Sequence, residues 1–198
     1  MRNVVLEAAI TLDGYIARPD GSVDYLFMPK GFSLEPFFKS IDVVIMGRKT
    51  YEVGLKLGGF GMFKIPIFVM SRSMPEREEG NLVFTHQSPR ELITALRKAK
   101  GKKIWLMGGG ELTRSFLQED LVDELSFGVV PILLGEGVPM FPAGFPQRNF
   151  TLAESKSYSG GFLRLHYQRD RKRSVPKEAG AVPKKRIGAK QKKRAEGL

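Results

Sequence analysis

Two segments of this chain share one pattern, in which an unbroken apolar run ends in glycine and leads into a helical stretch. They are DVVIMGRKTYE (42–52) and KIWLMGGGELTRSFL (103–117). An apolar run without polar alternation is typical of a strand that is buried on both faces of a sheet. The runs 65–71 and 81–85 have the same character. Because such strands alternate with helices, we predict an α/β sandwich built around a mostly parallel sheet.

Helix signals accompany these strands. Residues 88–101, SPRELITALRKAKG, begin with Ser88 as a capping residue and Pro89 in the first turn. Glu91 completes a capping box, and Gly101 stands where a helix commonly ends. We therefore predict a helix over this segment, and a shorter one within residues 33–41.

The C-terminal part of the sequence predicts further strands. Residues 123–135 indicate one long strand, and residues 150–158 and 162–169 form a predicted hairpin around the turn SGG. The hairpin adds an antiparallel edge to the sheet. We expect one domain, residues 1–170, followed by a basic tail, residues 171–198.

The net charge of +11 is concentrated in that tail. Residues 169–198 hold 12 of the 32 Lys and Arg but only 3 of the 21 Asp and Glu, so they carry +9 of the total. The segment has few large apolar residues, and we expect disorder because it cannot bury enough surface to offset its ordering entropy. It suits weak, nonspecific binding to the phosphates of a nucleic acid. A solubilising extension is an equally good interpretation.

Composition excludes several kinds of site. The chain contains no cysteine, so it has neither disulfides nor thiolate zinc ligands, and its two histidines, His86 and His166, lack the spacing of a ligand pair. No G-x-S-x-G motif marks a hydrolase nucleophile, and we expect His166 at the surface of its strand. No apolar run reaches the ~18 residues of a membrane span, and no signal peptide is evident. We expect a cytoplasmic protein without a metal.

The glycine turns are the candidate binding sites. The first N–H groups of a helix have no partner inside it, and together with the helix dipole they attract anions, which glycine lets approach closely. For Gly108–Gly110 alone, a tight turn is as good an interpretation as a phosphate site. The motif is not G-x-G-x-x-G, because Thr113 occupies the last position. The second turn, at Gly47, favours two phosphate sites that hold a dinucleotide.

Four motifs in one order make the chain recognisable. AAITLDGYIA, VVIMGRKTYE, IFVMSRS and IWLMGGGELTRSFL resemble the dihydrofolate reductase superfamily over residues 2–168. PILLGEGVPMF adds a likeness to the reductase domain of riboflavin biosynthesis, the C-terminal domain of the bacterial bifunctional deaminase–reductase. The resemblance implies a three-layer α/β/α sandwich with a mostly parallel mixed sheet. It also implies an NADPH-dependent reductase and a homodimer.

The resemblance also assigns residues to the cofactor. The turn at Gly47 would line the adenosine and pyrophosphate, Ser71 and Arg72 the 2′-phosphate, and Gly108–Gly110 the pyrophosphate and nicotinamide ribose. Arg48, Lys49 and Arg72 also supply the positive charge that the additional phosphate of NADP requires. The full set carried over is Ala9, Ile10, Ile16, Gly47, Arg48, Lys49, Thr50, Ser71, Arg72, Gly108, Gly109, Gly110, Glu111 and Leu112.

Carboxylates are the candidates for catalysis. Dihydrofolate reductases place an acid on the helix before the MGR strand, and Glu35 lies near that position. A buried Glu35 with a raised pKa could donate a proton, whereas an exposed one would only favour the helix dipole. Asp13, in the motif LDG, contacts substrate or only forms the turn. Asp24 is a weaker candidate on a substrate-side loop.

We therefore expect an NADPH-dependent oxidoreductase that transfers hydride to a small heterocycle, either pterin- or folate-like or ribosylaminopyrimidine-like. The alternative is a non-catalytic nucleotide- or nucleic-acid-binding protein that uses the basic tail.

Overall fold

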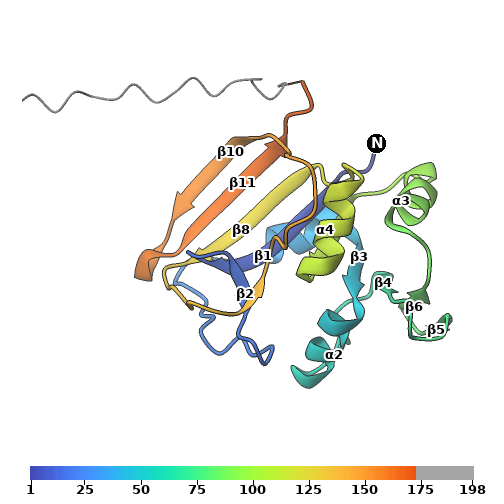
Figure 1. Cartoon of the computed structure of the whole chain (residues 1–198), viewed down its shortest axis with the longest axis horizontal. Coiled ribbons are helices and arrows are strands. Elements are labelled where there is room, and N and C mark those ends of the chain that lie inside the picture. The colour runs from blue at the N-terminus through green and yellow to red at the C-terminus, as the bar shows by residue number, and fades with distance from the viewer. Residues whose placement is uncertain (173–198) are drawn as a thin grey trace, which may run out of the picture.

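A nine-stranded mixed sheet organises the part of the chain that the computed structural model describes, residues 1–172 (Figure 1). The strand order is β10-β11-β8-β1-β7-β3-β4-β6-β5. The six central strands are parallel, and β10, β11 and β5 are antiparallel to their neighbours. The strands are β1 (Val4–Thr11), β3 (Ile41–Gly47), β4 (Ile67–Met70), β5 (Arg77–Glu79), β6 (Leu82–Thr85), β7 (Lys103–Gly108), β8 (Glu124–Val130), β10 (Phe150–Ser157) and β11 (Leu163–Arg169).

Helices cover both faces of this sheet and make the three layers. α3 (Pro89–Lys98) and α4 (Gly110–Gln118) pack on one face, where Leu92 and Phe116 are buried against β1, β3 and β7. α1 (Glu35–Ser40) and α2 (Arg48–Lys56) pack on the other, where Phe37 and Tyr51 join a second cluster around Trp105. The predicted α/β/α sandwich with a mostly parallel sheet is therefore confirmed.

Local signals were reliable guides to most elements. The predicted capping box is present, with the Ser88 hydroxyl accepting from the Glu91 N–H and the Glu91 carboxylate accepting from the Ser88 N–H. The predicted C-terminal hairpin is also present, joined by a short 3₁₀ turn, Ser159–Gly161. Two small features were not predicted, namely the edge strand β5 and a two-stranded sheet of β2 (Tyr15–Ala17) and β9 (Val138–Pro139).

The predicted strand over residues 123–135 is too long. β8 ends at Val130, because Pro131 has no N–H to continue a ladder. Beyond it, the N–H groups of Leu134 and Gly135 are bonded to Asp13 instead of to a neighbouring strand. The apolar run 131–134 therefore forms a loop beside the β1–β2 turn.

The predicted tail lies almost wholly outside the described residues, which end at Lys172. The last described residues remain attached to the domain, since the Arg171 guanidinium pairs with both Asp120 and Asp123. Among residues 1–172, no helix is both long and apolar enough to span a bilayer.

Candidate active site

The two glycine turns lie side by side in the structure. β3 and β7 are parallel neighbours, and Met46 pairs with Gly108 at the ends of these strands. A Cβ atom at Gly47 would lie 3.8 Å from the carbonyl oxygen of Gly108 and 3.8 Å from the Cβ of Leu112. The two turns therefore form one surface at the carboxyl edge of the sheet, the place where open α/β sheets bind ligands.

The helices that leave these turns have no side-chain caps. α2 has Gly47 and α4 has Gly109 at the capping position, and neither helix has a capping hydrogen bond from a side chain. By contrast, the N-terminus of α3 in the same domain has a capping box, formed by Ser88 and Glu91. Two adjacent nine-residue helices thus present unsatisfied N–H groups toward one place, which suits an anion with two phosphates.

Two of the three glycines are required by the fold. Gly108 has φ +101°, a left-handed conformation that L side chains rarely adopt, and its peptide bond to Gly109 is cis. A Cβ atom at Gly110 would lie 2.2 Å from the carbonyl oxygen of Pro139 and 3.0 Å from the ring of Pro142. These positions are explained by the turn and by close packing, without any ligand.

Gly109 is different. It has an ordinary φ of −78°, and a Cβ there would meet Thr50 Oγ1 at 3.4 Å and Ile16 Cδ1 at 3.6 Å. Alanine would therefore fit the backbone. The contacts also show that α2, α4 and the β2 strand converge here, so three of the sequence-predicted cofactor residues from distant parts of the chain are brought together.

The predicted cations differ in whether they already form an ion pair with an acid of the domain. Arg48 forms an ion pair with Glu52 one helical turn later, at 2.6 Å. Lys49 and Arg72 are exposed, and neither forms an ion pair with another of the residues 1–172. The Ser71 hydroxyl accepts hydrogen bonds from the N–H groups of Ser73 and Met74 in the same loop.

The remaining predicted cofactor residues lie around the same edge. Ala9 and Ile10 stand near the end of β1, where this strand pairs with β8, and are only partly buried. Leu112 contacts the Gly47 turn, whereas the exposed Glu111 pairs with Arg114 on its own helix. The Oγ1 of Thr113 is fully buried near Gly108 and has no hydrogen-bond partner among the described residues.

Asp13 ties together two loops. Its carboxylate accepts a 2.5 Å hydrogen bond from the Thr11 hydroxyl and bonds of 2.9 and 2.8 Å from the N–H groups of Leu134 and Gly135. The hydrogen bond from Thr11 is the main cause that lowers the pKa of Asp13. An acid that stays ionised is a poor proton donor. The hydrogen bonds to both loops agree with the turn-forming interpretation, and contact with substrate stays a prediction.

Removal of this carboxylate should free the loop. We expect Asp13→Ala to speed amide hydrogen exchange at Leu134 and Gly135, with Asp20→Ala, another exposed loop acid, as the control. The folded pKa of Asp13 lies below 3.8, so its stabilisation is present above pH 3.8 and is lost as the pH falls through the folded pKa. Unchanged exchange at both amides would show that the carboxylate does not hold the loop.

The prediction that a buried Glu35 donates a proton is wrong, because this side chain is 70% exposed and pairs with Lys39 along the surface of α1. Its place in the first turn of α1 agrees with the dipole interpretation. Asp24 is likewise exposed and paired with Arg18 at 2.6 Å, which lowers its pKa.

Sequence reasoning missed a buried charge cluster on the α1 side of the sheet. Glu7, on β1, is 5% exposed and receives both terminal nitrogens of Arg164, on β11, at 2.5 and 2.6 Å. Arg164 also donates to the Ser126 hydroxyl of β8, the strand between them. Burial raises the pKa of Glu7, against the lowering effect of Arg164. The available signal was Glu7 itself, an acid inside an apolar run, since a buried acid requires a cation.

His166 belongs to the same polar layer and is not the surface residue that its strand suggested. Its Nε2 lies 2.9 Å from the carboxylate of Glu124, which is buried in β8 and also receives Lys103 and Asn3. Burial acts to raise the pKa of Glu124, but these hydrogen bonds lower it overall.

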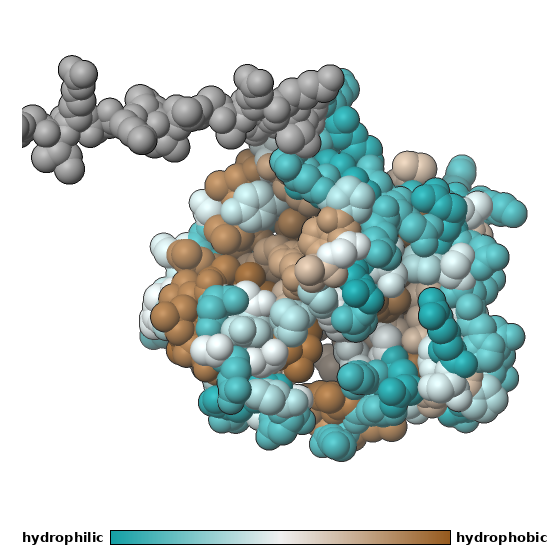
Figure 2. Space-filling view, in the orientation of Figure 1, coloured by the Kyte–Doolittle hydropathy of each residue, from teal (hydrophilic) through white to brown (hydrophobic). Residues whose placement is uncertain are grey.

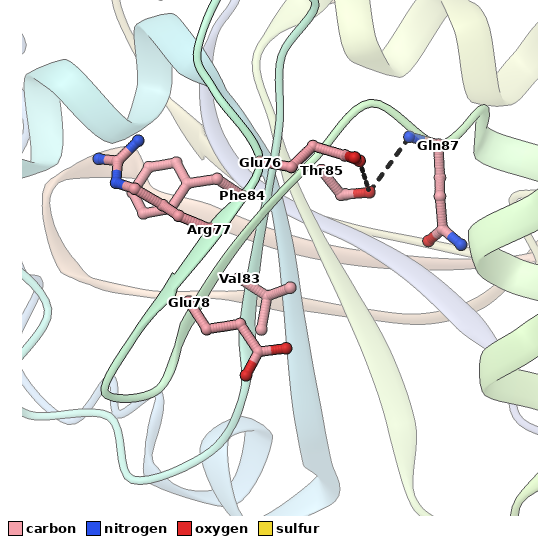
Figure 3. Close-up of a pocket in the computed structure, with 7 residues that line it drawn as sticks. All are labelled: Glu76, Arg77, Glu78, Val83, Phe84, Thr85 and Gln87. Carbon is pink, nitrogen blue, oxygen red and sulfur yellow. Dashed lines mark hydrogen bonds between the residues drawn. The ribbon is translucent and has the colours of Figure 1, made fainter.

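A shallow hollow of about 420 Å³ lies away from the glycine turns, on the β5–β6 hairpin (Figure 3). On one side of it, the Arg77 guanidinium stacks 3.6 Å over the Phe84 ring. On the other, Thr85 donates to Glu76 and accepts from the Gln87 N–H. No sequence-predicted site residue lines this hollow. Within residues 1–172, no group of three or more acidic or histidine side chains is placed to hold a metal ion.

The sheet order, the paired glycine turns and the layered helices define an α/β domain of the dihydrofolate reductase-like type. Residues 62–163 match the RibD C-terminal domain family. The chain is 34% identical to the uncharacterised protein YwjB of Bacillus subtilis over 172 residues, which cover 85% of this chain and 98% of YwjB. The chain therefore belongs to the RibD C-terminal domain family, and the predicted relationship is confirmed.

Solved structures agree with this assignment. A Shewanella sp. PV-4 protein with a proposed role in riboflavin biosynthesis superposes with a TM-score of 0.77 at 27% identity, covering 85% of this chain and 99% of that one. A deaminase/5-amino-6-(5-phosphoribosylamino)uracil reductase from Thermotoga maritima gives a TM-score of 0.67 at 16% identity. That match covers 85% of this chain and 57% of the Thermotoga protein, and it shows a shared fold.

Proposed function

We propose that this chain is an NADPH-dependent reductase that transfers hydride to a small heterocycle of the ribosylaminopyrimidine class, as in riboflavin biosynthesis. The observation that carries the proposal is the adjacency of two uncapped helix N-termini, at Gly47 and Gly109. The reductase named for the related Thermotoga structure supports the same chemistry. We also propose a cytoplasmic location, with which the absence of cysteine is consistent.

The residues at the turns fit such a cofactor. The free N–H groups of α2 and α4 would bind its pyrophosphate, and the cations Lys49 and Arg72 would bind its 2′-phosphate. Thr50 and Ile16 would border the space in front of Gly109. When bound, NADPH supplies the hydride, and the protein supplies orientation and electrostatics.

A pyrimidine substrate is favoured over a folate-like one by the position of Glu35. In the dihydrofolate reductases that the sequence resembles, an acid near this position supports protonation of the pterin. Here the side chain is exposed and paired with Lys39. Substrate orientation is therefore expected to come from other residues at the sheet edge.

The test is cofactor binding and turnover by the full chain. NADPH at 100 times its dissociation constant should stabilise the protein by about 2.7 kcal/mol. NADPH oxidation should depend on added 5-amino-6-(5-phosphoribosylamino)uracil and should be much slower with dihydrofolate. The absence of both NADPH binding and stabilisation would overturn the proposal, whereas binding without turnover would support a nucleotide-binding protein.

Selectivity for NADPH over NADH should depend on Arg72. Because a guanidinium–phosphate contact is charge-assisted and frequently bidentate, Arg72→Ala should weaken NADPH binding by about tenfold or more. NADH binding should be nearly unchanged, since NADH lacks the 2′-phosphate. Lys98→Ala, an exposed cation at the end of α3, is the matched control. Equal effects on the two cofactors would remove Arg72 from the 2′-phosphate site.

A further inference from the structure

Unpaired lysines gather at the amino end of the central strands, where the chain passes from α3 into β7. Lys98, Lys100 and Lys102 are exposed, and within residues 1–172 none of the three forms an ion pair. The ammonium group of Lys102 donates to a neutral group, the carbonyl oxygen of Lys39, at 2.9 Å. Lys98 lies in the last turn of α3, where a cation favours the helix dipole. Lys100 and Lys102 lie beyond that helix, so the dipole does not account for them.

Acids at this end of the sheet are paired with other cations. Asp42, on β3, binds the guanidinium of Arg2. Glu124, the first residue of β8, is buried and binds the ammonium of Lys103 at 2.6 Å. The charge that remains exposed here is therefore positive, and a ligand for this surface must carry negative charge.

Asp123 joins the end of α3 to the start of the basic tail. One of its carboxylate oxygens accepts from Arg97, in the last turn of α3, at 2.6 Å, and the other accepts from Arg171 at 2.9 Å. The tail therefore begins beside the exposed lysines. Residues 173–198 add nine Lys and Arg against two Glu. The positive charge of the tail is thus continuous with a positive surface on the domain, which the sequence alone did not show.

This positive surface and the glycine turns lie at opposite ends of the sheet. β7 begins at Lys103 and ends at Gly108, and at 3.3 Å per residue these two positions are about 17 Å apart. In Figure 1 the N-terminus and the end of β11 lie at the top of the molecule, and α2 lies at the bottom. Figure 2 shows hydrophilic surface around the end of β11 and over α3. A ligand bound here would leave the candidate active site free.

A polyanion with closely spaced charges fits a folded positive surface that continues into a long basic segment. Duplex DNA carries one negative charge per about 1.7 Å of its axis. Anionic membranes also attract polybasic segments, but stable anchoring there takes a second signal, such as an acyl chain or apolar side chains that insert. Residues 173–198 contain no aromatic residue, and the chain has no cysteine for acylation. Nucleic acid is therefore favoured over a membrane.

We propose that Lys98, Lys100 and Lys102 form, together with the basic tail, a binding surface for the phosphate backbone of nucleic acids. Phosphate contacts carry no information about base sequence, so the binding is nonspecific and depends strongly on salt. The surface lies at the far end of the strands from the glycine turns, so it does not depend on the proposed reductase activity. The chain then has two separate anion sites, one for a dinucleotide and one for a polynucleotide.

The test is a titration of a labelled DNA duplex, and of a single-stranded RNA of the same length, with the full chain at several salt concentrations. Lys98→Gln combined with Lys100→Gln removes two charges and keeps polar side chains. Each lost phosphate contact should make the slope of log K against log salt for the duplex less steep by about 0.9, or about 1.8 for both. The dissociation constant at low salt should rise by about tenfold or more.

Lys30→Gln combined with Lys56→Gln changes two exposed lysines outside this surface, and this matched control should leave both the slope and the affinity unchanged. In the tail, Lys184→Gln combined with Lys185→Gln should reduce the slope as the first pair does. A thermal melt of each variant checks that the fold is intact.

Binding to either nucleic acid with the expected change of slope supports the proposal, and the tighter of the two identifies duplex or single strand as the natural ligand. An unchanged slope in the Lys98 and Lys100 variant, or an equal loss in the control, would overturn it. Tight binding to phosphatidylserine vesicles without binding to DNA or RNA would also overturn it, in favour of a membrane. NADPH binding should be the same in all these variants, so failure of the proposed function would be seen separately.

Discussion

Alanine at Gly110 is expected to destabilise the protein, whereas alanine at Gly109 is expected to leave the fold intact and to weaken cofactor binding. A Cβ at Gly110 would lie 2.2 Å from the Pro139 carbonyl oxygen, which is backbone and has little freedom to move. Overpacking of this kind costs about 1–3 kcal/mol or more. We expect a loss of about 3 kcal/mol in the free energy of unfolding for Gly110→Ala.

Gly109→Ala meets only ordinary contacts, at 3.4 Å to Thr50 and 3.6 Å to Ile16. Its φ of −78° suits alanine, so the free energy of unfolding should change by no more than about 1 kcal/mol, the usual effect at a helix cap. The methyl group would, however, stand where a phosphate must approach the α4 N–H groups. We expect the dissociation constant for NADPH to rise by about a hundredfold. This is a larger loss of binding free energy than the 1.4 kcal/mol that corresponds to a tenfold change.

The two variants are compared by urea unfolding with and without NADPH. Gly110→Ala should lower the midpoint in both conditions. Gly109→Ala should lose only the stabilisation that NADPH provides. If Gly109→Ala binds NADPH like the natural protein, the triple glycine serves the turn alone, and the phosphate site must be sought elsewhere.

Arg164→Met is expected to destabilise the protein strongly, because it leaves the buried Glu7 carboxylate without its cation. Breaking a buried ion pair by removal of one partner costs about 3–5 kcal/mol. Replacement of both partners, Glu7→Leu with Arg164→Met, should restore most of the free energy of unfolding, since apolar pairs often match a buried ion pair. Arg18→Met breaks an exposed pair with Asp24, which solvent screens, and should change the free energy of unfolding far less than Arg164→Met does.

The pH dependence gives a second readout of Glu7. Its folded pKa is raised above 4.5 by burial, so protonation favours the folded state, and stability is lost as the pH rises through the folded pKa. Arg164→Met removes the hydrogen bonds and the charge of Arg164, which lower the pKa of Glu7, and should therefore raise this pKa further. The difference in unfolding free energy between Arg164→Met and the natural protein should therefore shrink from pH 8 to pH 5. A difference that is constant with pH would mean that the methionine disrupts packing only.

Much of the fold could be predicted because its signals are local. The unbroken apolar runs at β3, β4 and β7 need no distant partner to be recognised as buried strands. The capping box of α3 depends only on Ser88 and Glu91, three residues apart. The predicted end of β8 was wrong, because the apolar run continues past Pro131 while the strand ends at Val130.

The candidate site likewise has one part that local sequence could predict and another part that it could not. The glycine turns at Gly47 and Gly108 could be found in the sequence, because each is a strand-to-helix junction complete in itself. Burial of Glu35 could not be judged, since α1 has six residues and its exposed side is set by what packs beneath it. The Glu7–Arg164 pair joins residues 157 positions apart and depends on the strand order β11-β8-β1.

The sequence by itself determined the elements of this protein: the buried strands, the helices with their caps, and two glycine turns with bare helix N-termini. These follow from side-chain periodicity and backbone sterics within a few residues. Only the tertiary structure decided which strands are neighbours, and therefore that the two turns form one surface, that Glu7 meets Arg164, and that β10 is left open at the edge. Strand order depends on packing between segments distant in the chain, where no single residue carries the information.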